Sequence, residues 1–116
     1  MIAKTRSISI RGFEAIPITV ETDLLPGQIH TMIVGLADNA VRESRERIRS
    51  AIRESGFYFP VKQIILNLSP GDHPKEGTIA EFAMATGILI ASGQLPQSAF
   101  EKTILLGALS LDGSIR

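Results

Sequence analysis

The stretch IVGLADNAVRESRERIRSAIRESG, residues 33–56, contains the end of a strand, a short connection and one well-marked helix. Asp38 or Asn39 can cap this helix, because a short side-chain oxygen can accept a hydrogen bond from a free first-turn N–H. Gly56 is placed to end it as a left-handed residue just beyond the last turn. At 100° per residue, one helix face collects small and apolar residues and should pack on a core. These residues are Ala40, Val41, Ser44, Ile48, Ala51, Ile52 and Ser55.

A row of four arginines borders that face, and we call it the arginine row: Arg42, Arg45, Arg49 and Arg53. The remaining arc holds Glu43, Glu46, Arg47 and Glu54. Guanidinium groups at this spacing could follow a phosphate backbone or contact a protein partner. The plainer interpretation is a solvated helix face with local pairs such as Glu43–Arg47 at i,i+4. No aromatic residue is interleaved with the row to stack on bases.

The composition predicts a soluble globular domain. The chain has 116 residues, of which 44% are apolar and 21% charged, so it can bury a modest core and is not disordered. The net charge is zero, so any binding to nucleic acid must come from a local patch. The absence of cysteine excludes disulfides and thiolate chemistry and fits the cytoplasm. There is no signal-peptide pattern, and the most apolar stretch, residues 82–91, is too short for a bilayer, which needs roughly 20 residues.

The first third of the chain contains three predicted strands, at residues 5–10, 18–23 and 28–34. In the first strand the alternation places Ile8 and Ile10 on the apolar side, with Ser7 and Ser9 toward water or an edge. A Leu-Pro-Gly turn at 25–27 separates the second and third strands. Three successive strands with short connections predict an antiparallel meander.

The rest of the chain adds a central strand at 61–68, a loop at 69–77, a helix at 79–91 and a strand at 103–111. Thr78 can cap the second helix, with Glu81 in the capping-box position. This helix is apolar nearly all round and should be deeply buried, and Gly93 ends it. The order β-β-β-α-β-α-β predicts one α+β two-layer sandwich over residues 1–116.

The C-terminal residues look like an unfinished hairpin. Asp112-Gly113 is typical of a hairpin tip within residues 111–114. The returning strand has only two residues before the chain ends at Arg116. We therefore expect the chain to be a fragment of a longer protein.

Residues with catalytic or metal-binding potential gather around the loop at 69–77. A metal site would need three or four convergent ligands, and the loop spacing of the acidic residues and histidine does not imply convergence. The candidates are Asp72, His73, Glu76 and Glu81, with His30 in a strand elsewhere. Ser69 or Thr78 could act with Lys75 only if the amine were held against the hydroxyl in a dry pocket. Helix capping explains Thr78 better, so we expect no catalytic residue and no metal ligand.

Phosphate-binding motifs are weak in this sequence. No G-x-x-x-x-G-K-[ST] loop is present. The segment GLADN at 35–39 precedes a helix N-terminus, where free N–H groups could hold an anion. A single glycine is a weak signal, and ordinary strand-to-helix geometry explains it better.

Several blocks of the sequence resemble one family. They are VGLADNAVRESRERIRSAI (34–52), SGFYFP (55–60), IILNLSPGD (64–72), KEG (75–77) and LGALSLDGSIR (106–116). Together they resemble the N-terminal domain of the magnesium-chelatase-like AAA+ ATPases of the ComM/YifB family.

The resemblance implies properties that the residues alone do not give. It implies a Lon-protease-like domain with the ribosomal protein S5 domain 2-like fold, continuing beyond Arg116 into an ATPase module. ATP and Mg²⁺ would bind that module, so no residue here inherits a cofactor site. Members linked to natural transformation act as hexameric helicases that promote DNA branch migration. The implied partners are the protein's own ATPase module, further copies of the chain, and DNA.

The resemblance also argues against peptidase activity. Lon-type proteases carry KDGPSAG, whose serine falls on Ile79 when laid on this chain, and the partner lysine would lie past Arg116. The family pattern KEGSxFDLP is replaced here by a divergent segment, Ala80, Glu81, Phe82 and Ala83. We expect a non-catalytic assembly or regulatory domain. The alternatives are a degenerate peptidase with Thr78 as nucleophile and a stand-alone nucleic-acid-binding module.

Overall fold

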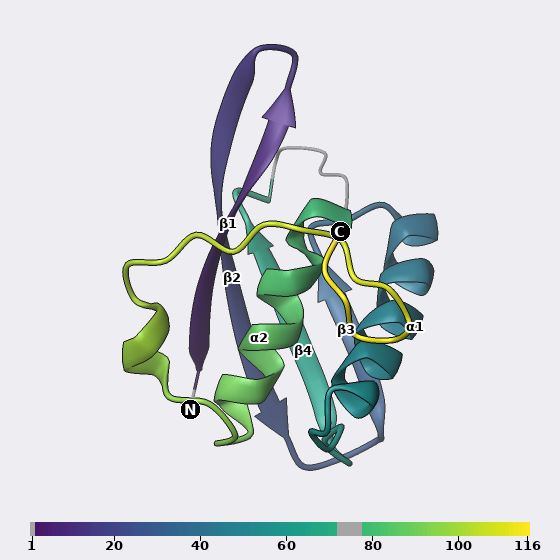
Figure 1. Ribbon diagram of the computed structural model, residues 1–116. Helices are drawn as coiled ribbons and strands as arrows, with labels where there is room; N and C mark the ends of the chain where they lie inside the picture. The colour runs from purple at the N-terminus through teal and green to yellow at the C-terminus, as the bar shows by residue number, and fades with distance from the viewer. Residues whose placement is uncertain (1, 72–77) are drawn as a thin grey trace.

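Two helices pack on one face of a four-stranded sheet in the computed structural model, which describes residues 2–71 and 78–116 (Figure 1). The strands are β1 (Ala3–Arg11), β2 (Glu14–Leu25), β3 (His30–Val34) and β4 (Gln63–Ser69). The helices are α1 (Asp38–Glu54) and α2 (Glu81–Ala91), with short 3₁₀ turns at η1 (Thr78–Ala80) and η2 (Gln97–Phe100). The predicted α+β two-layer class is confirmed. No helix in the described ranges is long and apolar enough to cross a membrane.

The sheet order is β1-β2-β4-β3, so the predicted three-strand meander is wrong. β1 and β2 form an antiparallel hairpin, and β2 pairs antiparallel with β4. β3 instead lies beyond β4 and pairs with it in parallel. A parallel neighbour needs a long crossover, and α1 supplies it. The prediction that β4 is central is confirmed, because its fully buried Ile64 and Leu66 belong to a strand paired on both sides.

β1 faces the opposite way from the prediction. Thr5, Ser7 and Ser9 are buried under the helices, whereas Ile10 is 63% exposed. Small side chains suit this face because α2 lies very close to it: Thr5 Oγ1 donates a hydrogen bond to the Ala83 carbonyl at 2.7 Å. Large isoleucines would hold the helix further from the sheet.

Gly87 provides a test of this close packing. A methyl group at Gly87 would meet Thr22 Oγ1 at 2.4 Å. Overpacking costs about 1–3 kcal/mol, which outweighs the roughly 1 kcal/mol that Gly→Ala gains inside a helix. Gly87→Ala should therefore lower the urea midpoint, and Thr22→Ala/Gly87→Ala should recover most of the loss. A higher midpoint for Gly87→Ala alone would contradict the packing argument.

The ends of α1 confirm one prediction and correct another. The N-cap is Ala37, without a side-chain capping bond, so neither Asp38 nor Asn39 caps the helix. Asp38 is instead the first helical residue, where its charge favours the positive end of the helix dipole. Gly56 has φ +88°, which confirms it as the left-handed residue beyond the helix.

α2 begins two residues later than predicted, because residues 78–80 form the 3₁₀ turn η1. Its N-cap is Ala80, again without a side-chain capping bond, so the capping roles predicted for Thr78 and Glu81 are wrong. The helix ends at Ala91, and Gly93 takes φ +79°, which confirms its predicted role.

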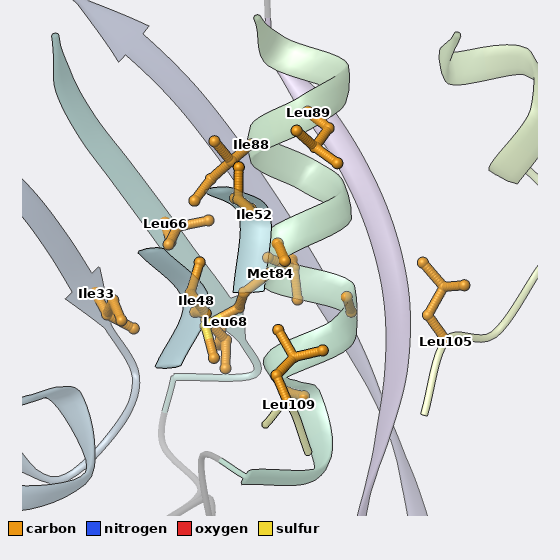
Figure 2. Packing of buried hydrophobic residues seen from close by; sticks show 14 of the residues in the cluster. Ile33, Ile48, Ile52, Leu66, Leu68, Met84, Ile88, Leu89, Leu105 and Leu109 are labelled. Carbon is orange, nitrogen blue, oxygen red and sulfur yellow. The ribbon is translucent and has the colours of Figure 1, made fainter. Parts of the chain in front are cut away.

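The core lies between the two helices and the sheet (Figure 2). The buried residues of α1 are Ser44, Ile48, Ala51 and Ile52, all on the predicted face, whereas Ser55 is exposed. α2 is buried on almost every side, as predicted, with Met84 and Ile88 fully inaccessible. The arrangement leaves one edge of α1 near β3 and the other near α2.

Residues 103–111 do not form the predicted strand. They run as extended chain past β1, η1 and the start of α2, and their backbone N–H groups bond to several different elements (Figure 1). Leu105 N–H donates to the Arg6 carbonyl at 2.8 Å, and Gly107 N–H donates to the Ile79 carbonyl at 3.0 Å. The predicted hairpin at 111–114 is confirmed, since Ser110 N–H donates to the Ser114 carbonyl at 2.9 Å.

Candidate functional site: the arginine row and the Glu81 network

The arginine row lies on the edge of α1 next to β3. Arg45, half-buried, donates from a terminal guanidinium nitrogen to the Thr31 carbonyl of β3 at 3.2 Å. Arg42, Arg49 and Arg53 are exposed. Within residues 2–71 and 78–116, none of the four arginines forms an ion pair. The helix therefore presents a line of guanidinium groups without carboxylate partners from the described parts.

Arg49 rests on an aromatic ring that the sequence analysis did not connect to the row. Its guanidinium carbon lies 5.4 Å from the centre of the Phe59 ring. The contact forms because the chain folds back after Gly56, and cation–π attraction favours the arrangement. The aromatic run just after the helix was the available signal.

The opposite edge of α1 carries a buried ionic network centred on Glu81, which is 0% exposed. We call it the Glu81 network. Arg47 donates from Nε at 2.8 and 3.0 Å to the two carboxylate oxygens, and a terminal nitrogen lies 2.7 Å away. Ser44 Oγ donates at 2.8 Å and the Leu109 backbone N–H at 3.0 Å. One carboxylate thus joins α1, α2 and the C-terminal segment.

The network keeps a buried charge stable by surrounding it with donors. An isolated buried carboxylate is very costly, and an arginine with further hydrogen bonds compensates that cost. The hydrogen bond that Arg47 donates to Glu81 raises the pKa of Arg47, so the guanidinium stays charged. The helix periodicity predicts Arg47 in the solvated arc, but its side chain reaches Glu81. The predicted Glu43–Arg47 pair exists, but only at 4.0 Å with Glu43 67% exposed, so Glu81 is the main partner.

The metal candidates do not converge in the described part of the chain. Asp72, His73 and Glu76 lie outside the described residues, and Glu81 is bound to Arg47. His30 is exposed on the edge strand β3. No group of three His, Cys, Asp or Glu side chains suited to a metal ion occurs within the described ranges.

The two described nucleophile candidates lie on different elements. Thr78 is exposed at the start of η1, and Ser69 is half-buried at the end of β4, near the Asn67 amide at 3.5 Å. Lys75 lies outside the described residues. Ile79, the position of the Lon serine in the resemblance, is half-buried and its carbonyl accepts the Gly107 N–H.

Gly35, in the segment considered for anion binding, has a packing explanation. It has φ +104°, and a Cβ there would lie 2.6 Å from the Leu68 carbonyl of β4. Only glycine allows this close backbone approach between the β3–α1 connection and the central strand.

The fold and the Glu81 network define an α+β domain whose helices are joined by a buried ion pair. The family described as subunit ChlI of Mg-chelatase matches residues 20–116, and the chain belongs to this family. The resemblance read from the sequence blocks is thereby confirmed.

Curated relatives agree with this assignment. The chain is 44% identical over 105 residues to YifB of Salmonella typhimurium and 38% identical over 105 residues to competence protein ComM of Haemophilus influenzae. Each alignment covers 90% of this chain and 21% of the relative. A Mycobacterium tuberculosis protein is 36% identical over 115 residues, which cover 99% of this chain and 23% of that protein. The chain therefore spans about a fifth of the length of these relatives.

Proposed function

We propose that this domain is a non-catalytic assembly or regulatory domain of a magnesium-chelatase-like AAA+ ATPase. The observation that carries the proposal is the state of Glu81. This carboxylate is the ionisable group of α2 nearest to Ile79, the position that the serine occupies in Lon-type proteases. It accepts hydrogen bonds from Arg47, Ser44 and the Leu109 backbone. A carboxylate held in this way joins structural elements and is not available for proton transfer.

The proposal extends to the whole protein. We infer an N-terminal Lon-like domain followed by a module that binds ATP and Mg²⁺, assembled as a hexamer in the cytoplasm. The proposed activity is ATP-dependent DNA branch migration during natural transformation. The support is family membership and the competence protein ComM of Haemophilus influenzae among the relatives.

A peptidase assay tests the non-catalytic part. The purified chain should release no more peptide from casein than buffer does, and Thr78→Ala should give the same trace. Thr78 is exposed, lies in η1 and is not a partner of Glu81, so the substitution should leave the fold intact. Hydrolysis that Thr78→Ala abolishes, or labelling of Thr78 by a hydroxyl-directed covalent probe, would establish the degenerate-peptidase alternative.

A second experiment tests the assembly part. A full-length protein carrying this domain should hydrolyse ATP with Mg²⁺, and removal of residues 1–116 should change its oligomeric mass or its DNA-stimulated rate. Analytical ultracentrifugation and a coupled ATPase assay measure both. An unchanged mass together with an unchanged rate would refute an assembly or regulatory role.

A further inference from the structure

We propose that the arginine row binds the phosphate backbone of single-stranded nucleic acid without reading its sequence. The inference rests on the charges and geometry of α1 and not on the ATPase proposed above. Arg42, Arg45, Arg49 and Arg53 stand at i, i+3, i+7 and i+11, which spreads four positive charges over roughly 16 Å of helix.

The row is unneutralised, unlike the other edge of the same helix. Arg47 has both Glu81 and Glu43 within 4.0 Å, whereas no ion pair in the described ranges involves the four row arginines. Two acidic residues, Asp38 and Glu46, share this side of α1, and neither forms an ion pair with the row in those ranges. A chain of zero net charge therefore concentrates positive charge along one helix edge.

Two of the four side chains are held in place before any ligand arrives. Arg45 is fixed to the Thr31 carbonyl through one terminal nitrogen, and Arg49 lies over the Phe59 ring. A guanidinium group has five N–H donors, so both retain donors for a phosphate. Pre-ordering lowers the conformational entropy lost on binding.

A single strand fits this surface better than a duplex. The row runs along the axis of α1, and a flexible single strand can lie along it. Each backbone of a duplex instead winds around the duplex axis and so leaves the row. Arginine suits the phosphodiester because its planar donors match phosphate oxygens and its face can stack on an unpaired base. An acidic protein segment would offer carboxylates without a regular spacing and without bases.

The test is fluorescence anisotropy with a labelled dT oligonucleotide and the whole 116-residue chain at several salt concentrations. Four phosphate contacts on a single strand predict a log–log salt slope of about −3, and hence a roughly 50-fold loss of affinity from 50 to 200 mM salt. The triple variant Arg42→Gln/Arg49→Gln/Arg53→Gln should have a shallower slope, between about −1 and 0. Arg45 is left unchanged because it also contacts β3.

A matched control removes the same charge elsewhere. Lys4→Gln/Lys62→Gln/Lys102→Gln alters three exposed lysines outside α1 and should keep the wild-type slope. Glu46→Gln should tighten binding, because it removes a negative charge beside the row. Circular dichroism confirms that each variant is folded.

Several results would overturn the inference. The inference is wrong if the chain does not bind the oligonucleotide at 50 mM salt, or if the lysine control loses as much of the salt slope as the arginine variant. It is also wrong if a duplex of the same length binds as tightly as the single strand, or if polyglutamate competes as well as unlabelled oligonucleotide. The last result would identify an acidic protein partner instead.

Discussion

Replacing Glu81 by alanine should lower the free energy of unfolding by about 3–5 kcal/mol, the usual loss when one partner of a buried ion pair is removed. The substitution leaves the Arg47 charge, 26% exposed, without its main partner and removes the acceptor of the buried Leu109 N–H. The chain has no tryptophan and one tyrosine, so far-UV circular dichroism in urea is the suitable measurement.

Glu43→Ala provides the control on the same arginine. Its carboxylate lies 4.0 Å from Arg47 and is 67% exposed, so its removal should cost no more than about 0.5 kcal/mol. In a double-mutant cycle, Arg47→Ala/Glu81→Ala should lose less than the sum of the two single changes, because neither charge is left alone. Equal effects of Glu43→Ala and Glu81→Ala would refute a central role for Glu81.

Gly35→Ala should cost about 2–6 kcal/mol, from two independent sources. The residue has φ +104°, a conformation that costs a side-chain-bearing residue about 1–3 kcal/mol. The new methyl would also lie 2.6 Å from the Leu68 carbonyl, a backbone atom in the central strand that cannot move aside cheaply. Overpacking of this kind costs about a further 1–3 kcal/mol.

Gly56→Ala separates the two sources. Gly56 has φ +88°, but nothing lies within 4 Å of an added Cβ. The substitution should therefore show only the backbone cost, about 1–3 kcal/mol. The expected order of urea midpoints is wild type, then Gly56→Ala, then Gly35→Ala. If both variants unfold at the same urea concentration, the Leu68 contact does not contribute.

The sequence predicts α1 well because its signals agree. Apolar spacing, the glycine at 56 and the charges on the outer arc all indicate one helix, and the buried face follows directly. The predicted N-cap residue is wrong. Asp38 has a side chain suited to capping, but the helix already begins there and Ala37 occupies the N-cap position. Local propensity does not determine which neighbouring residue makes that turn.

The sheet order and the orientation of β1 could not be read from local patterns. Short connections favour pairing of successive strands, but β3 finds its partner across the α1 crossover. In β1 the apolar Ile10 lies outward and the hydroxyls inward, because the closeness of α2 selects small side chains there. Both features depend on long-range packing that alternation does not encode.

The helix periodicity predicts the four row arginines on one edge of α1, and whether they form a site stays a prediction, whereas the Glu81 network was missed. A glutamate within an apolar, buried helix requires a cationic partner, and that rule was the available signal. This rule does not identify Arg47 as the partner, because Arg47 and Glu81 are 34 positions apart and meet only when the two helices pack together. The resemblance places aspartate in the family pattern at this position, so a carboxylate is kept where the segment otherwise departs from the pattern.

The extended segment after residue 103 also affects how the chain acquires its structure. Leu105 bonds to Arg6, Leu109 to Glu81 and Leu111 to Ser50, so this segment completes contacts with the first strand and both helices. Folding rates fall as contacting residues lie further apart in sequence. The Glu81 network therefore gains its last hydrogen bond only once the chain has been synthesised as far as residue 109.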